Sequence, residues 1–277
     1  MVNPVKVRKR SGEFVDFDIH KLKSSLARSG ADDSQIDAVV MHIKASLHNG
    51  ISTREIYQRA YQFLRKLSYR SAGRYKLKKA ILELGPTGFP FEKFVARLLS
   101  SQGYEVQVGQ LVPGKCVTHE VDVVARKQGK QLMVECKFHS DSNSKSDVKV
   151  SLYIHSRFND VKDTWKSMPE NQGIRFEGML VTNSRFTEDA LQYGICAGIN
   201  MVSWDSPIGE SLRDWVDRSG LHPITSLKTL KKSEKQTLLE KDIVLCCEIP
   251  AHPEILNSII PSERRRNAVL KEVKQLI

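Results

Sequence analysis

The sequence predicts a mixed α/β protein in three parts: an N-terminal hairpin with a helical bundle, a central mixed sheet flanked by helices, and a small C-terminal helical region. Three observations support this. Short central segments alternate apolar and polar residues, the flanking segments repeat apolar residues at helical spacing, and Gly/Pro breaks separate the parts. One break is LGPTGFP, and Gly220 with Pro223 form the other. The expected parts are 1–84, 85–218 and 219–277.

In the first part, VKVRKR and FVDFDI flank the turn SGE, which predicts a β-hairpin. Leu22 and Leu26 recur at helical spacing after Asp18, a good N-cap residue. Ser52 and Glu55 have the spacing of a capping box and predict a further helix. A basic helix is expected through AGRYKLKKAILEL.

The central part opens with a helix whose apolar stripe includes Phe91, Phe94 and Leu98. The strands YEVQV, HEVDVVA and QLMVECKF follow, then a helix capped by Asp147 and the strand GMLVT. A helix capped by Thr187, the strand INMVSW and a helix near GESLRDWV complete the order. This alternation predicts a mixed central sheet.

Composition excludes several classes of protein. The 277 residues are 40% hydrophobic and 27% charged, as in globular proteins and unlike disordered ones. No apolar run approaches the roughly 18 residues of a membrane span, and the first residues lack a signal-peptide core. The five cysteines form no CxxC pattern, which argues against structural zinc and a disulfide scaffold. We expect a cytoplasmic protein without membrane partners.

The net charge of +11 is unevenly distributed. Residues 1–84 hold 17 Lys and Arg against 8 Asp and Glu, residues 85–218 hold 16 against 17, and residues 219–277 hold 10 against 7. Basic flanks around a near-neutral middle favour phosphate-bearing partners, either nucleotide or nucleic acid. A basic surface that only serves solubility explains the charge alone equally well.

Charged residues interrupt two strands that otherwise suit a core. Glu135 and Lys137 project from one side of their strand, and Asp122 lies one short turn earlier on the preceding strand. Two carboxylates, with the Cys136 carbonyl as a third ligand, suit Mg²⁺, for which Mn²⁺ can substitute. Such an ion would polarise a phosphoryl oxygen, and Lys137 would stabilise the developing charge. The alternative is a buried or half-exposed Glu–Lys pair that lies on a sheet face and has no catalytic role.

The segment EVDVV…LMVECKFH resembles the D…ExK signature of the PD-(D/E)XK nuclease superfamily, with Val121 where the motif's name has proline. The stretch LVTNSRFTEDALQYGICAGINMVSWD resembles the end of an Mrr-type restriction endonuclease domain. The resemblance covers roughly residues 88–216. It implies that Asp122 and Glu135 bind metal, that Lys137 is catalytic, that Glu92 lies near the metal, and that double-stranded DNA is the substrate.

The stretch VRKRSGEFVDFDIHKL is similar to the ATP-cone, a nucleotide-sensing module, and GISTREI fits a later part of it. The resemblance implies an ATP or dATP effector and a homo-oligomer. No G-x-x-x-x-G-K-[ST] loop is present, so the nucleotide is expected to regulate rather than to be hydrolysed. The nucleotide-binding residues implied are Val7, Lys9, Arg10, Lys21, Leu22 and Thr53.

The last part contains short leucine-containing helical segments and the basic run Arg264 to Arg266. This part fits two interpretations equally well. It is either a degenerate helix-hairpin-helix element that binds the DNA backbone or a helical appendage without a DNA-binding role. The basic run is more typical of surface charge than of DNA reading.

Together these patterns predict a Mg²⁺-dependent DNA endonuclease regulated by ATP or dATP. A junction or repair nuclease would share the chemistry. The alternative from another class is a nucleotide-sensing DNA-binding protein whose nuclease fold is inactive.

Overall fold

The computed structural model describes residues 5–9, 11–141 and 143–277, so Arg10 of the predicted nucleotide site lies outside the described residues. The chain divides into two compact units, one ending at Leu77 and including Lys271–Ile277, the other spanning Lys78–Leu270. The predicted fold class is confirmed: a hairpin plus helices, a mixed sheet, and a helical C-terminal region. No described helix has both the length and the apolar character needed to cross a membrane.

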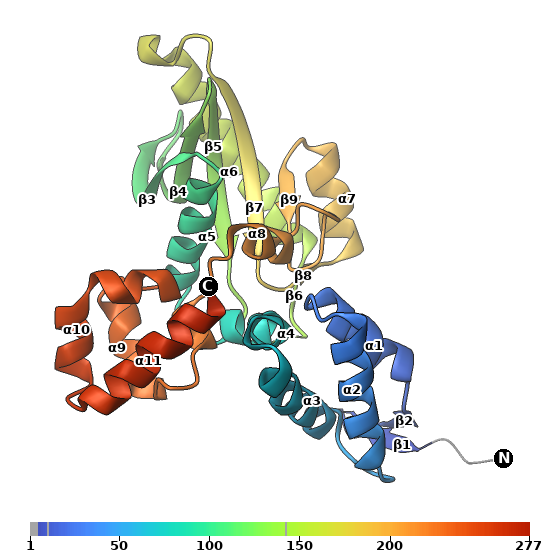
Figure 1. The fold of residues 1–277 in the computed structure, drawn as a ribbon. Coiled ribbons are helices and arrows are strands. Elements are labelled where there is room, and N and C mark those ends of the chain that lie inside the picture. Colours follow the sequence, from blue (N-terminus) through green and yellow to red (C-terminus); the bar gives the residue numbers. More distant parts are fainter. Residues whose placement is uncertain (1–4, 10, 142) are drawn as a thin grey trace. The chain divides into compact units, whose positions relative to one another are not determined.

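The first unit is a two-stranded hairpin with helices (Figure 1). Val7 pairs with Val15 in the hairpin, and its side chain packs into the helical core. Leu26, Val39 and Leu64, from three successive helices, are fully buried there. The elements are β1 (Lys6–Arg8), β2 (Phe14–Asp16), α1 (Ile19–Arg28), α2 (Asp33–Ala45), α3 (Thr53–Leu67) and α4 (Tyr69–Leu82), the last of which continues into the second unit.

The predicted helix starts follow from local hydrogen bonds. The Asp18 carboxylate accepts from the backbone N–H groups of His20 and Lys21, as an N-cap side chain does. Ser52 likewise accepts from the Glu55 N–H at 3.1 Å. The expected capping box is wrong in its second half, because the Glu55 carboxylate pairs with Arg59 Nη2 at 2.6 Å.

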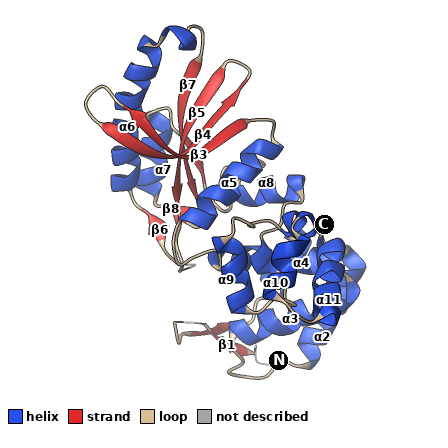
Figure 2. Ribbon diagram, turned by 90° about the vertical axis from the view of Figure 1, so that its left-hand side faces the viewer, coloured by secondary structure: helices blue, strands red, loops and turns tan. Residues whose placement is uncertain are grey.

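The second unit contains a five-stranded sheet in the order β3-β4-β5-β7-β9. β3, β4 and β5 pair antiparallel, whereas β7 pairs parallel with both β5 and β9. Helices α6 and α7 lie on one side of the sheet and α5 and α8 on the other (Figure 2). The elements are α5 (Phe89–Ser101), β3 (Glu105–Pro113), β4 (Thr118–Lys127), β5 (Lys130–Lys137), α6 (Val148–Ser167), β7 (Arg175–Thr182), α7 (Glu188–Cys196), β9 (Asn200–Val202) and α8 (Leu212–Ser219), with a short parallel pair β6 (Lys145–Ser146) and β8 (Arg185–Phe186) and a 3₁₀ turn η1 (Pro169–Asn171).

The strand expected at YEVQV is longer than predicted. β3 continues to Pro113 and stays in one register with β4, from Glu105↔Arg126 to Pro113↔Thr118. Gly109 lies in the middle with φ +62°, a backbone conformation that glycine adopts easily. The strand therefore continues through Gly109, which directly follows the last residue predicted for it.

Helix α6 fixes the position of the later site. Asp147 caps it, and Phe158, Val161 and Trp165 are buried in a cluster with Met133 of β5. The Trp165 and Phe176 rings pack with their centroids 5.3 Å apart. The buried apolar surface anchors the helix across the sheet.

The C-terminal region is helical, as expected. Two of its three consecutive arginines are used internally: Arg265 forms two bonds to the buried Glu234 at 2.7 and 2.9 Å, and Arg266 donates to the carbonyls of Ile260 and Pro261. The elements are η2 (Ile224–Ser226), α9 (Lys232–Glu240), η3 (Cys246–Ala251), α10 (Pro253–Ile259) and α11 (Glu263–Leu276). These contacts make the basic run a structural element of the region.

Candidate functional site

Strands β4 and β5 separate at the predicted motif. Their ladder runs from Lys127↔Lys130 to Val123↔Val134 and ends there, while β5 continues beside β7 as far as Lys137↔Thr182. Asp122 immediately precedes Val123 in β4 and lies just beyond the end of this ladder. Its carboxylate reaches across to β5 and accepts a hydrogen bond from the Cys136 N–H at 2.7 Å. One carboxylate oxygen thus joins the strands where their backbone pairing stops.

Glu135 lies on the face of β5 that packs against α6. Its parallel partner Leu180 belongs to the cluster containing Ile154 of α6, and its side chain is only 19% exposed. Burial, followed by the negative charges of Asp122 and Glu92, raises the pKa of Glu135 to about 7. The carboxylates that the sequence predicts as metal ligands are therefore close enough to repel one another.

Glu92 joins this cluster from the first turn of α5. Burial, then the charges of Asp122 and Glu120, raise the pKa of Glu92 to about 7. Burial also raises the pKa of Asp122, against the opposing effects of the Cys136 N–H and Arg157. We call Glu92, Asp122 and Glu135 the carboxylate cluster.

Lys137 is exposed at the end of β5, and its charge acts on both Asp122 and Glu135. His139 follows it and is half-buried, with Nε2 2.9 Å from Ser146 Oγ. Asn183 accepts from the His139 N–H and donates to its carbonyl, both at 2.8 Å, which fixes the chain after β5. Lys137 therefore stands at the open edge of the carboxylate cluster.

Arg157 of α6 is a part of the site that the motif does not reveal. Its Nη1 donates to Glu135 Oε2 at 2.8 Å, and its Nη2 donates to the Glu120 carbonyl oxygen. It lies three residues after Ile154 and four before Val161, so it falls on the buried stripe of its helix. A charged residue in that register is the signal that could have identified it.

The donor chemistry of the carboxylate cluster fits a hard divalent cation, because carboxylate oxygens are the ligands that Mg²⁺ prefers. Among the described residues, however, no three Asp, Glu, His or Cys side chains are already grouped around one point as metal ligands. Glu135 is instead paired with Arg157. Side-chain movement at Glu135 is therefore needed to complete a ligand set.

A second polar feature lies where the β3–β4 turn meets α6. Asp160 accepts from the N–H groups of Cys116 and Val117 and lies 2.8 Å from His119 Nε2. The hydrogen bond with His119 lowers the pKa of Asp160 to about 2. This carboxylate holds the turn that leads into β4.

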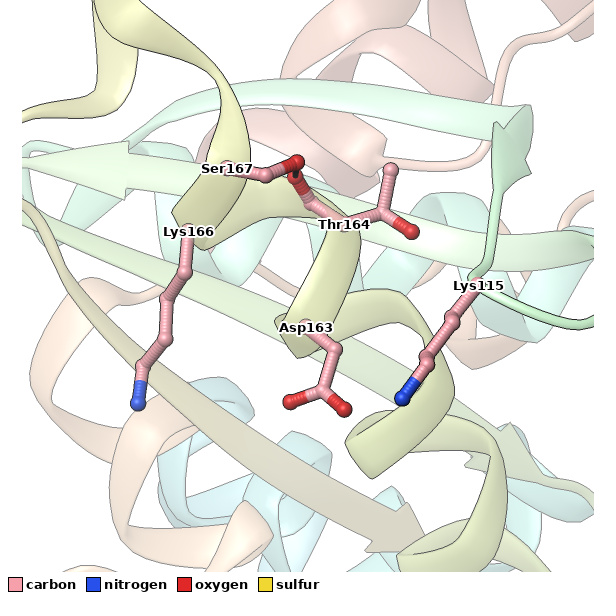
Figure 3. A pocket seen from close by; sticks show the side chains of 5 residues that line it. All are labelled: Lys115, Asp163, Thr164, Lys166 and Ser167. Atoms are coloured by element: carbon pink, nitrogen blue, oxygen red, sulfur yellow. Dashed lines mark hydrogen bonds between the residues drawn. The ribbon is translucent and has the colours of Figure 1, made fainter.

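Beside this turn is a pocket of about 550 Å³, shown in Figure 3. Lys115 and Lys166 lie on either side of Asp163 in it, with Thr164 and Ser167 above. None of its lining residues belongs to the carboxylate cluster. The pocket is therefore separate from the residues predicted to bind metal.

The turn gives a stability prediction. A Cβ at Gly114 would collide with the Asp160 carboxylate and lie 2.5 Å from the Val117 carbonyl oxygen. We expect Gly114→Ala to lower the free energy of unfolding by about 1–3 kcal/mol, measured by urea denaturation. Lys115→Ala, in the same turn, is the control and should differ little from the native protein. Equal stability of all three proteins would contradict the proposed tight fit.

The predicted nucleotide-binding residues occupy two different environments. Val7 and Leu22 are buried in the core of the first unit. Lys9 and Lys21 are exposed, with Lys9 Nζ 2.9 Å from Glu13 and Lys21 Nζ 3.5 Å from Asp18. Thr53 begins α3, and the preceding Ser52 forms a parallel bridge with Arg8 of β1. The hairpin and the start of α3 are thus side by side.

Comparisons with known proteins agree with this architecture. The family models that match are "ATP cone domain" over residues 5–82, "Restriction endonuclease" over 85–207, and "AF1548-like, C-terminal" over 222–277. An uncharacterized protein from Archaeoglobus fulgidus is 33% identical over 184 residues, which is 66% of this chain and 99% of that protein. The chain belongs to the AF1548-like family. It combines an ATP-cone domain with an Mrr-type restriction endonuclease domain, as the sequence predicts.

Two solved structures are similar to this AF1548-like chain. A crystal structure of AF1548, described as a protein of unknown function, is 31% identical with a TM-score of 0.57 and covers 69% of this chain and 98% of that one. The MspJI restriction endonuclease in complex with a 27-mer oligonucleotide is 14% identical with a TM-score of 0.36, covering 53% of this chain and 32% of that one. The AF1548 match extends over nearly the whole of that protein.

Proposed function

We propose that this protein is a divalent-metal-dependent DNA endonuclease whose activity or assembly responds to ATP or dATP. The observation that carries the proposal is the carboxylate cluster beside Lys137 at the point where β4 and β5 separate. The restriction endonuclease domain supports the proposed DNA cleavage, and the ATP-cone domain supports the proposed response to nucleotide.

In this proposal, Asp122 and Glu135 hold the metal ion, with Glu92 and the Cys136 carbonyl completing its surroundings. A bound Mg²⁺ or Mn²⁺ supplies Lewis-acid polarisation of the phosphoryl oxygen and a more acidic water. Lys137, exposed at the edge of the cluster, stabilises the negative charge that develops on the phosphate. Asp122 joins β4 to β5 by accepting from the Cys136 N–H, which positions its own carboxylate beside the strand that carries Glu135.

The proposed effector site is in the ATP-cone domain. Lys9, Arg10 and Lys21 supply charge for the phosphates, and Val7, Leu22 and Thr53 shape the adenine side. The nucleotide alters cleavage only if it binds two states of the protein with different affinity. A change of homo-oligomeric state is the form that we expect those two states to take.

A non-cleaving, nucleotide-sensing DNA-binding protein is the second candidate. The ion pair between Glu135 and Arg157 favours it, because a carboxylate held by a guanidinium is not free to bind a metal ion. This candidate predicts nucleotide-dependent DNA binding and no cleavage with any divalent ion.

A plasmid-nicking assay on the full chain distinguishes the two. With double-stranded plasmid we expect conversion of supercoiled to open-circular or linear DNA in Mg²⁺ or Mn²⁺, and none in EDTA. ATP and dATP titrations should change that rate by at least about fivefold, the lower end of the effects usually found for allosteric coupling. Cleavage that persists in EDTA would reject the metal dependence of the proposed nuclease. Absence of cleavage in every metal, while DNA binding is retained, would reject nuclease activity. A flat response to both nucleotides would reject regulation alone.

A further inference from the structure

Arg157 places a permanent positive charge inside the carboxylate cluster. Its side chain is 10% exposed, and its Nη1 lies 2.8 Å from Glu135 Oε2. Its Nη2 donates to the Glu120 carbonyl oxygen. A guanidinium does not lose its proton in proteins, so this charge is present at every working pH.

The remaining surroundings give Arg157 a way to stay in place when Glu135 moves. Its guanidinium carbon lies 5.3 Å from the centre of the Tyr153 ring, one helical turn earlier on α6. Its Nε is buried, and no described atom accepts a hydrogen bond from it. The bond to Glu120 and the Tyr153 ring do not involve Glu135, so they can retain the guanidinium without it.

A divalent ion and this guanidinium need the same carboxylate. Both are positive, and both would lie against Glu135 in a site with little water, where like charges repel strongly. The bond to Arg157 therefore has to weaken before Glu135 can become a metal ligand.

We propose that Arg157 is a built-in counter-ion that competes with the divalent ion for Glu135 and so weakens metal binding. This inference rests on the proposed function, because it assumes that Glu135 is a metal ligand. Its consequence is a metal site that fills only when the divalent ion is abundant enough to displace the guanidinium. In the protein without metal, Arg157 neutralises part of the repulsion within the carboxylate cluster.

The test measures Mn²⁺ binding to the full chain without DNA at pH 8, above the pKa of about 7 of Glu135, by titration calorimetry and by the electron paramagnetic resonance signal of free Mn²⁺. Arg157→Met keeps the apolar stem and removes the charge, so it should bind Mn²⁺ about tenfold more tightly than the native protein. Arg157→Lys keeps the charge but loses the two-point contact of the guanidinium, so its Mn²⁺ affinity should lie between those of the native protein and Arg157→Met. Equal or weaker binding by Arg157→Met would overturn the competition. Absence of Mn²⁺ binding in both native and Arg157→Met proteins would instead overturn the proposed metal site itself.

A second measurement on the native sequence covers the case in which Arg157→Met does not fold. The ¹⁵N–¹H signals of the Arg157 guanidinium, assigned with Arg157→Lys, report whether its NH₂ groups are held. We expect slow rotation of both groups in EDTA. As Mg²⁺ is added, the Nη1 signals should average because that group loses Glu135, while the Nη2 group stays held by the Glu120 carbonyl. Signals that remain unchanged when Mg²⁺ saturates the protein would overturn the proposal.

Discussion

Glu135→Gln is expected to lower Mg²⁺-dependent plasmid nicking on the order of a thousandfold, because the amide removes the negative charge that a metal ion requires. Lys137→Ala should lower it on the order of a hundredfold, through loss of charge stabilisation on the phosphate. Gel assays of nicking rate at saturating Mg²⁺ measure both. DNA binding should persist in both variants, since neither residue is proposed to carry most of the affinity.

Matched controls exist within the same sheet. Glu177 of β7 is also an ion-paired strand carboxylate, 22% exposed against 19% for Glu135. Its partner Lys130 lies on β5, as Lys137 does. Glu177→Gln and Lys130→Ala should therefore leave nicking within about threefold of native, by the usual size of surface ion-pair effects. Native-level nicking by Glu135→Gln would show that the carboxylate cluster takes no part in DNA cleavage.

The stability of the metal-free protein should fall as the pH rises from about 5 to about 7. The pKa of Glu135 is about 7 in the folded chain, above its ordinary value of 4.5, because of burial and the charges of Asp122 and Glu92. The folded state therefore keeps a proton that the unfolded state has lost, and raising the pH favours unfolding. We expect a loss of about 2 kcal/mol from Glu135, complete by pH 8, with Glu92 acting in the same direction.

Urea denaturation in EDTA at pH 5, 6, 7 and 8 measures this loss. Carboxylates of lowered pKa, such as Asp160, act only below about pH 4.5 and lie outside the window. His139 has a lowered pKa and contributes with the opposite sign through this range. The decisive quantity is therefore the difference between native and Glu135→Gln proteins. The variant should lose less stability between pH 5 and 7, and identical pH profiles would show that Glu135 is not protonated in the folded state.

Much of the fold was predictable because its signals are local. The caps Asp18, Asp147 and Thr187 begin helices at the expected residues, since a cap depends only on the next two or three N–H groups. The β6–β8 pair was not predictable. It joins Lys145–Ser146 to Arg185–Phe186, and two residues carry no periodicity to detect.

The candidate site likewise has a part that the sequence predicts and a part that it does not. The proximity of Asp122, Glu135 and Lys137 could be predicted from their spacing, because a hairpin brings neighbouring strands together. Arg157 was not placed in the site, since its contact with Glu135 spans 22 residues and depends on how α6 lies across the sheet. The helix predicted after Asp147 includes this position, but nothing in its local pattern indicates which acidic side chain Arg157 meets.

The Cys136 N–H bond to Asp122 affects the choice of an inert variant for crystallising a complex with DNA. Asp122→Ala would deprive that backbone donor of its acceptor and loosen the very region to be visualised, at a cost of about 1–3 kcal/mol. Asp122→Asn retains a carbonyl oxygen that can accept the same N–H while removing the negative charge. The asparagine form is therefore the better choice for capturing an uncut duplex.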